Sequence, residues 1–276
     1  MDGIIDNLTN ALNTWNEKLA EIWVLLTQSP QDFKGGGIWQ AVVSIHQGLQ
    51  AIGLALLVLF FVIGVAKTCS NLNEVKRPEQ ALRLFIRFAI ARGLVVYGME
   101  LMLKIFEIVQ GITSTIMNTV GVGNATTTTL PQSVIDAVEN AGFLESIPLW
   151  AVTLLGGIFI TVLSFVLILT VYGRFFKLYM YTAISPIPLA ASASESTQNI
   201  AVTFIKSYAG VCMEGAIIVL SCIIFSKFAA SPPAVDETAS AVNMLWSYVG
   251  EVIFNMLILV GTVKMSDHVV KDMLGL

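Results

Sequence analysis

The stretch 149–172, LWAVTLLGGIFITVLSFVLILTVY, contains 24 consecutive residues without a charge. A helix of about 20 apolar residues crosses the hydrocarbon core of a bilayer, whereas a helix on the surface of a soluble protein has a polar face. The rest of the chain has a similar character, because 55% of its 276 residues are hydrophobic and only 12% are charged. Soluble domains have about a quarter of their residues charged. The sequence therefore predicts an all-α, polytopic membrane protein.

Other apolar stretches predict further crossings. With 149–172 they make about five transmembrane helices, expected near 47–66, 93–117, 149–172, 201–225 and 241–263. The piece 175–194 is also apolar, but it is too short for two crossings. Pro186 and Pro188 remove backbone hydrogen-bond donors from any continuous helix there. We expect a broken or re-entrant element at this motif, which begins at Ser185.

The N-terminal residues have a different pattern from the apolar spans. Residues 1–37 are predicted to form an extracytoplasmic amphipathic helix, broken by a glycine triplet after Lys34, and residues 38–276 a helical transmembrane domain. Apolar side chains recur at steps of three and four, and they include Trp15 and Trp23. Tryptophan suits a membrane interface, but the same stripe could equally pack on another subunit.

The distribution of charge predicts the orientation. If the first 37 residues and the loops 118–147 and 227–241 share one side of the membrane, that side has 3 basic and 10 acidic residues, and the other side has 11 basic and 5 acidic residues. Lys and Arg in short loops are retained in the cytoplasm. We therefore expect the N-terminus outside and the C-terminus inside, an arrangement that five crossings satisfy.

A polar seam follows one face of the expected span 93–117. Its members recur at steps of four and three: Gly93, Tyr97, Glu100, Lys104, Glu107, Gly111 and Ser114. A charge near the bilayer centre costs on the order of 2.5 to 3.5 kcal/mol, so lipid cannot be what this seam faces. One interpretation is a packing seam in which Glu100 pairs with Lys104. The other is the wall of a hydrated pore or a subunit interface, with Glu100, Lys104 and Glu107 as candidates.

Further polar residues lie inside the last two expected spans. Glu214 and Glu251 each have a glycine neighbour, and Asn255 follows Glu251 by one turn. Small residues let helices approach closely, so these three residues are also candidates for a pore wall or subunit interface. Proton relays use such carboxylates, but neither span contains His or Asp, which favours hydrogen-bonded packing. His46 is interpreted as an interfacial or hydrogen-bonded histidine rather than a metal ligand.

Basic residues gather on the side expected to be cytoplasmic. We predict that they contact lipid headgroups or a partner: Lys76, Arg77, Arg83, Arg87, Arg92, Arg174 and Lys177. Arginines in such a set could instead bind nucleic acid or an acidic protein, but the positive-inside rule predicts a cluster here in any case. Lipid anchoring is therefore the preferred interpretation.

The chain has no motif of a known enzyme site. It has no phosphate-binding Walker loop, no GxSxG and no HExxH, and its three cysteines lack the spacing of a zinc site. The sequence predicts a protein that is not an enzyme and that needs no cofactor or metal ion. Bound phospholipids are expected in crevices between neighbouring protomers.

Two segments resemble a known family. Residues 172–215, YGRFFKLYMYTAISPIPLAASASESTQNIAVTFIKSYAGVCMEG, resemble TrbL-like and VirB-type polytopic subunits of bacterial conjugation, that is, type IV secretion machines. The part with Arg174, Pro186, Pro188 and Ala190 is the most similar. Residues 73–95, NEVKRPEQALRLFIRFAIARGLV, are similar to the version in conjugative elements of Gram-positive bacteria. The resemblance covers about residues 40–265.

The resemblance implies a function and a set of partners. Such subunits lie in the bacterial cytoplasmic membrane and form a homo-oligomeric ring, for which it suggests five-fold symmetry. They contact secretion ATPases, the pilin and other secretion subunits, and they help to pass single-stranded DNA with its relaxase. Some relatives have long soluble extensions, which we do not expect in this chain. A secondary transporter of a small solute and a membrane subunit of another export complex are the alternatives.

Overall fold

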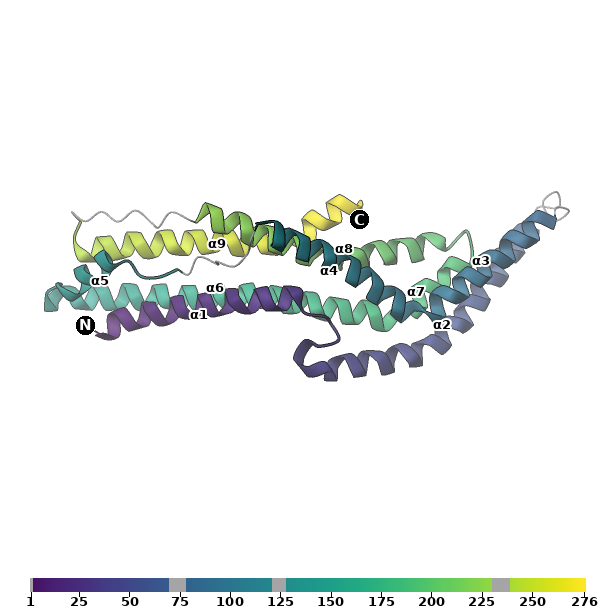
Figure 1. Cartoon of the computed structure of the whole chain (residues 1–276), viewed down its shortest axis with the longest axis horizontal. Coiled ribbons are helices and arrows are strands. Elements are labelled where there is room, and N and C mark those ends of the chain that lie inside the picture. Colours follow the sequence, from purple (N-terminus) through teal and green to yellow (C-terminus); the bar gives the residue numbers. More distant parts are fainter. Residues whose placement is uncertain (1, 70–77, 121–127, 230–238) are drawn as a thin grey trace. The chain divides into compact units, whose positions relative to one another are not determined.

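The computed structural model describes residues 2–69, 78–120, 128–229 and 239–276, and every regular element in these ranges is a helix (Figure 1). In chain order these are α1 (Asp2–Thr27), η1 (Phe33–Gly36), α2 (Gly37–Cys69), α3 (Pro78–Val96), α4 (Gly98–Val120), α5 (Gln132–Glu139), α6 (Phe143–Ile184), α7 (Pro186–Ala190), η2 (Ala191–Ala193), α8 (Gln198–Phe228) and α9 (Ala241–Leu274). The predicted all-α class is confirmed.

Within the described ranges, 4 helical stretches are long and apolar enough to cross a membrane: Phe33–Lys67, Phe143–Ile184, Gln198–Phe228 and Ala241–Leu274. They include four of the five expected spans. The remaining one, 93–117, extends across the junction of α3 and α4 and is not among them. The physical reason is the charge of α4, because Glu100, Lys104 and Glu107 lie within three turns of one another.

The apolar piece 175–194 is not one element. Residues 175–184 are the last turns of α6, a single helix of 42 residues, and the chain then forms α7 and η2. A helix that continues to Ile184 is physically reasonable, because the first proline after the expected span is Pro186. The change of element therefore falls at the proline motif, and the residues before it stay helical.

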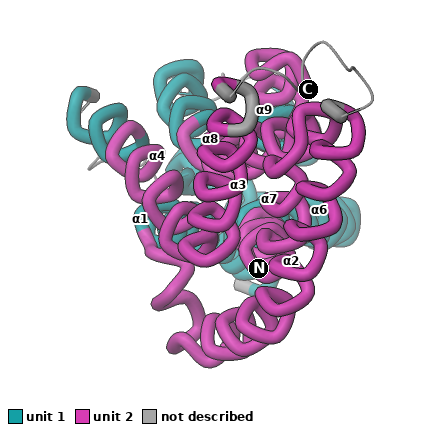
Figure 2. The backbone as a smooth tube through the Cα atoms, turned by 90° about the vertical axis from the view of Figure 1, so that its right-hand side faces the viewer, with its two compact units in different colours: residues 1–27, 113–172, 217–266 teal, residues 28–112, 173–216, 267–276 magenta. Residues whose placement is uncertain are grey.

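The described residues form two compact units (Figure 2). Unit 1 comprises Met1–Thr27, Thr113–Tyr172 and Ile217–Ser266, and unit 2 comprises Gln28–Ile112, Gly173–Ala216 and Asp267–Leu276. Helices α4, α6, α8 and α9 therefore each contribute residues to both units. The units do not follow chain order, because neighbouring helices within each one come from distant parts of the sequence.

In unit 1, α1 packs against α6 through the predicted apolar stripe. Trp15 is 1% exposed and Ile22 is fully buried. Gly157 of α6 lies under α1, where an added Cβ would be 3.2 Å from the carbonyl oxygen of Asn7. The stripe thus covers a helix of its own chain, which neither of the two sequence interpretations named. The helix also ends earlier than expected, at Thr27, with positive φ angles at Lys34, Gly35 and Gly36 after it.

Glu21 ties α1 to α6 by polar contacts. It accepts a hydrogen bond from the Tyr172 hydroxyl, and its other oxygen lies 2.7 Å from Lys18 Nζ. This hydrogen bond to Glu21 raises the pKa of Lys18. Nearby, the Asn16 amide pairs with the backbone of Thr128, donating at 3.0 Å and accepting at 3.1 Å. Unit 1 therefore has specific polar links as well as apolar packing.

Unit 2 is built around close contacts between α2, α3 and the proline motif. Gly53 of α2 lies against the backbone of Pro186, where an added Cβ would be 2.7 Å from the carbonyl oxygen, and only glycine allows two backbones to approach this closely. Gly98, the first residue of α4, lies against the side chain of Leu189, where an added Cβ would be 3.1 Å from Cδ1. The buried cluster that results contains Leu57, Ala91, Val95, Met102, Phe106, Leu178, Leu189, Phe204, Tyr208 and Val211 among others.

Many large apolar side chains remain on the surface of the chain. On α6 alone, Ile158, Phe159, Val162, Phe165 and Leu169 are each more than half exposed. Such contiguous apolar surface would associate in water, but it matches the hydrocarbon of a bilayer. The structure therefore agrees with the membrane assignment in its surface as well as in its helix lengths.

Candidate functional site

The proline motif creates a buried polar site in unit 2. Pro186 has no N–H, so it cannot donate to the carbonyl of Thr182, which would be its partner in a continuous helix. His46 of α2 has its Nδ1 at 3.0 Å from this carbonyl oxygen, and the Ser185 hydroxyl donates to the same oxygen at 3.0 Å. Because a carbonyl only accepts, Nδ1 must carry the proton. His46 is thus hydrogen-bonded, as the sequence predicted, and it satisfies a group that the proline left without its helical donor.

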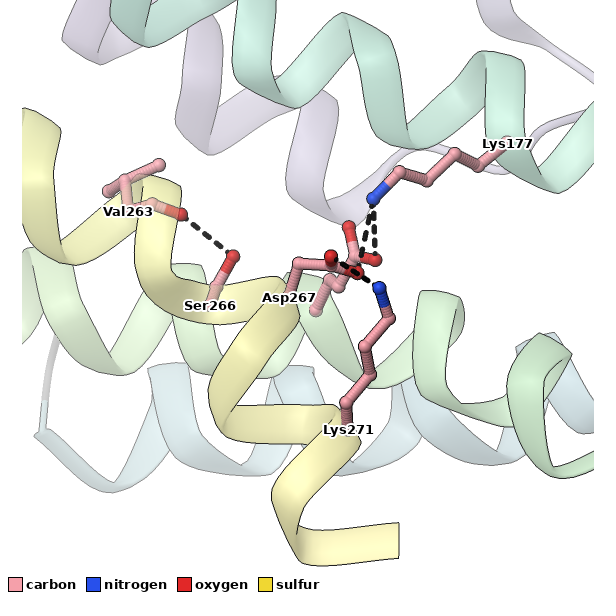
Figure 3. Close-up of polar contacts among 6 residues, drawn as sticks. Lys177, Val263, Ser266, Asp267 and Lys271 are labelled. Carbon is pink, nitrogen blue, oxygen red and sulfur yellow. Dashed lines mark hydrogen bonds and ion pairs between the residues drawn. The ribbon is translucent and has the colours of Figure 1, made fainter. Parts of the chain in front are cut away.

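A cluster of charged side chains joins three spanning helices in unit 2 (Figure 3). Lys177 of α6 donates to Glu214 of α8 at 3.0 Å and to Asp267 of α9 at 3.3 Å. Lys271, one turn further along α9, donates to the other oxygen of Asp267 at 2.8 Å. Glu214 is 5% exposed, so its charge is kept from lipid by the chain's own helices.

This charged cluster contains two residues that the sequence singled out, Lys177 and Glu214, and two that it did not. Glu214, for which the sequence left open a pore wall or subunit interface and favoured hydrogen-bonded packing, lies inside unit 2, paired with Lys177. Asp267 and Lys271 were not among the candidates, because the predicted span ended at residue 263. The signal that could have found them is the helical spacing of Val263 and Val270, which continues the inward face of α9 beyond residue 263; both are buried, as is Ser266 between them.

Arg174 is buried beside this cluster, at 3% exposure. Its guanidinium carbon lies 5.6 Å from the ring centre of Phe175 and 6.0 Å from that of Phe106, within the range of cation–π attraction. Its Nε and Nη1 have no hydrogen-bond acceptor among the described residues. We predicted from the sequence that Arg174 contacts lipid headgroups or a partner, but the structure places it among aromatic side chains.

Helix α4 has one buried and one exposed face. Met102 and Phe106 are at most 3% exposed and belong to the core of unit 2. The opposite side is exposed and is called the charged face of α4; it consists of Glu100, Lys104, Glu107 and Gly111, together with Tyr97 just before the helix. Lys104 donates to Glu107 at 2.6 Å. We predicted from the sequence that Glu100 pairs with Lys104, four residues away. The structure instead pairs Lys104 with Glu107, three residues away.

The other predicted residues are not members of these clusters. Glu251 and Asn255 belong to the part of α9 in unit 1, where Glu251 is exposed and Asn255 is partly buried. On α3, Arg83 and Arg92 are exposed, and Arg87 pairs with Glu195 at 3.4 Å. Lys76 and Arg77 lie outside the described residues. Within the described ranges, no three His, Cys, Asp or Glu side chains are close enough to hold a metal ion.

Comparison with known proteins gives one family. The family described as TrbL/VirB6 plasmid conjugal transfer like protein matches residues 15–186. This range begins within α1 and ends at the first proline of the motif, so it includes the charged face of α4, Arg174 and Lys177. Neither the curated proteins nor the solved structures that were compared with the chain gave a match. Because the matched residues make up more than half of the chain, it belongs to the TrbL/VirB6 plasmid conjugal transfer like family.

Proposed function

We propose that this chain is a channel or scaffold subunit of a conjugative type IV secretion machine, and that copies of it form a homo-oligomeric ring in the inner membrane. It hydrolyses nothing itself. It helps a DNA–protein substrate to cross and the pilus to assemble, with secretion ATPases, pilin and other secretion subunits as partners and single-stranded DNA with its relaxase as transient cargo. Membership of the family supports the assignment to a conjugative transfer system, and the charged face of α4 supports the ring.

The charged face of α4 is the observation that carries this proposal. Lys104 is 71% exposed and Glu107 is 56% exposed on the single chain, although the opposite side of the helix is packed. An exposed ion pair is costly in hydrocarbon, so in a membrane it must meet water or another protein. A ring of copies supplies both, because this face then lies against a neighbour or lines a hydrated axis.

The proposal places the second crossing at the expected span 93–117, from the last turn of α3 into α4. The bias of basic residues puts 66–92 in the cytoplasm and the acidic loop 118–147 outside, so the chain between them has to cross. The backbone stays hydrogen-bonded through the junction, since Tyr97 donates to Gly93 and Leu101 donates to Tyr97, both at 2.9 Å. Such pairing is what a crossing needs in the absence of water.

Single-cysteine labelling tests the proposal. In a chain with Cys69, Cys212 and Cys222 replaced by alanine, Glu100→Cys and Glu107→Cys should react with a membrane-impermeant thiol reagent or form disulfides between copies. The matched controls are Phe159→Cys and Leu169→Cys, at exposed apolar positions of α6, which should do neither. If the α4 cysteines are as inert as these controls, α4 faces lipid and the ring proposal is wrong.

A further inference from the structure

Unit 2 has a groove between α3 and the start of α8, with a volume of 410 Å³. One end of it is polar and basic. Arg83 and Arg87, one helical turn apart on α3, line this end, with Ile86 between them. Ser192 of η2 and Gln198, the first residue of α8, also line the groove. Arg87 also lies 3.4 Å from the carboxylate of Glu195, which places this end of the groove beside the N-terminus of α8.

The rest of the groove is apolar. Further along α3 its lining residues are Ile90 and Leu94, and further along α8 they are Val202 and Ile205. Leu94 and Ile205 pack on the same buried cluster, so both helices lead from the basic end into the core of unit 2. Ile90 remains 58% exposed and Val202 41% exposed, so the apolar wall is open to whatever surrounds the chain.

We propose that this groove is a binding site for one anionic phospholipid, with its phosphate on Arg83 and Arg87 and an acyl chain along Ile90, Leu94, Val202 and Ile205. The basic end, with two arginines and the carboxylate of Glu195, has a net charge that one anionic headgroup neutralises. Basic pockets between membrane helices on the cytoplasmic side favour such headgroups. The first N–H groups of α8, a helix of 31 residues, add to the attraction.

This site is distinct from lipid held in crevices between protomers, since every residue that forms it belongs to one chain and one unit. It does not depend on the proposed secretion function. The apolar walls favour a lipid over a free phosphate, which would leave them unfilled. They also favour a lipid over single-stranded DNA, because bases are held by stacking on aromatic rings and the side chains lining this groove include none.

Native mass spectrometry of the full chain in detergent tests the proposal with phosphatidylglycerol and phosphatidylcholine of identical acyl chains as probes. The unaltered chain should retain one phosphatidylglycerol and much less phosphatidylcholine. The double variant Arg83→Gln/Arg87→Gln should lose at least about tenfold in phosphatidylglycerol affinity, because each surface arginine contributes several-fold to the binding of anionic lipid. The matched control Arg92→Gln, on the same helix and outside the groove, should retain the lipid.

A second pair of variants tests the apolar wall without changing charge. Val202→Trp should fill the groove and displace the lipid, whereas Ile200→Trp, also exposed on α8 but outside the lining, should not. Equal unfolding temperatures within each pair establish that folding is unaffected. The proposal is overturned if both members of each pair bind alike, if inorganic phosphate displaces the lipid, or if a single-stranded oligonucleotide does so.

Discussion

Arg174 has an unusual environment for a charged residue in a membrane chain. A buried guanidinium needs compensation, and here the aromatic rings of Phe106 and Phe175 provide part of it. The side chain has little freedom to move, because it is buried and its guanidinium lies against both the Phe106 and Phe175 rings and Gly215 of α8. The glycine is therefore needed for the position that Arg174 takes.

We predict that Gly215→Ala lowers the free energy of unfolding in detergent by about 1 to 3 kcal/mol, because the added methyl group overlaps the guanidinium and overpacks the core. The matched control is Gly173→Ala in α6, where an added Cβ meets nothing within 4 Å. That variant should be neutral or more stable by up to about 1 kcal/mol, because alanine is the better helix former. Equal stabilities for the two variants would show that Arg174 is not confined by Gly215.

The Thr182 carbonyl offers a second test at the scale of single residues. His46 and Ser185 both donate to it, so either donor can partly compensate for loss of the other. His46→Leu and Ser185→Ala should each lower the free energy of unfolding by about 1 kcal/mol. The double variant should lose more than the sum, because it leaves a buried carbonyl without a partner.

The measurement is a double-mutant cycle of denaturant unfolding in detergent. Ser44→Ala is the control, since Ser44 is exposed and its hydroxyl bonds only within its own helix, to Gln40, among the contacts described. Strict additivity would mean that the two donors act independently and that the carbonyl displaced by Pro186 has another source of compensation.

At the scale of the helix, the charged face of α4 can be tested by exchanging charges. Lys104→Glu would place three acidic residues on one exposed face, and like charges at this spacing repel. An exposed pair contributes little to folding, so the unfolding temperature should barely change. DNA transfer between cells should nevertheless fall, because the face meets a neighbouring copy or a hydrated axis in the proposed ring.

The exchange Lys104→Glu/Glu107→Lys restores the composition of this face and should recover most of the transfer. A mating assay, with the amount of protein in the membrane measured in parallel, distinguishes the two variants. Transfer by Lys104→Glu at the level of the unaltered chain would contradict a role for this face in assembly.

At the scale of the whole molecule, the chain is a membrane subunit of a conjugative transfer system of the inner membrane. Its proposed topology depends on whether α3 and α4 cross. We predict that a reporter fused after residue 69 is cytoplasmic, that one fused after residue 140 is outside, and that one after residue 276 is cytoplasmic. Alkaline phosphatase, active only outside, and a fluorescent protein, folded only inside, measure the three positions. Residues 69 and 140 on the same side would show that α3 and α4 do not cross.

Much of the fold could be predicted from the sequence, because the bilayer imposes local requirements. The apolar run 149–172 had to be a spanning helix, and a break was expected at the prolines. The continuation of the helix to Ile184 was not expected, because the apolar piece 175–194 indicated a separate element. The seam of α4 was also visible, since its residues follow one another at helical spacing. The N-terminal stripe was recognised as a buried face, but its partner was not, since a pattern of apolar residues does not identify the surface that covers it.

The sequence by itself therefore determined that this chain is a membrane protein. It also determined which stretches form helices and at which residues one of these helices breaks. Only the tertiary structure decided that Lys177 meets Glu214 and Asp267, that His46 caps the carbonyl released by Pro186, and that two arginines open onto an apolar groove. The reason is distance along the chain. Helix formation and burial in lipid depend on residues within a few turns, whereas these contacts join residues 37 to 136 positions apart, whose meeting depends on how whole helices pack.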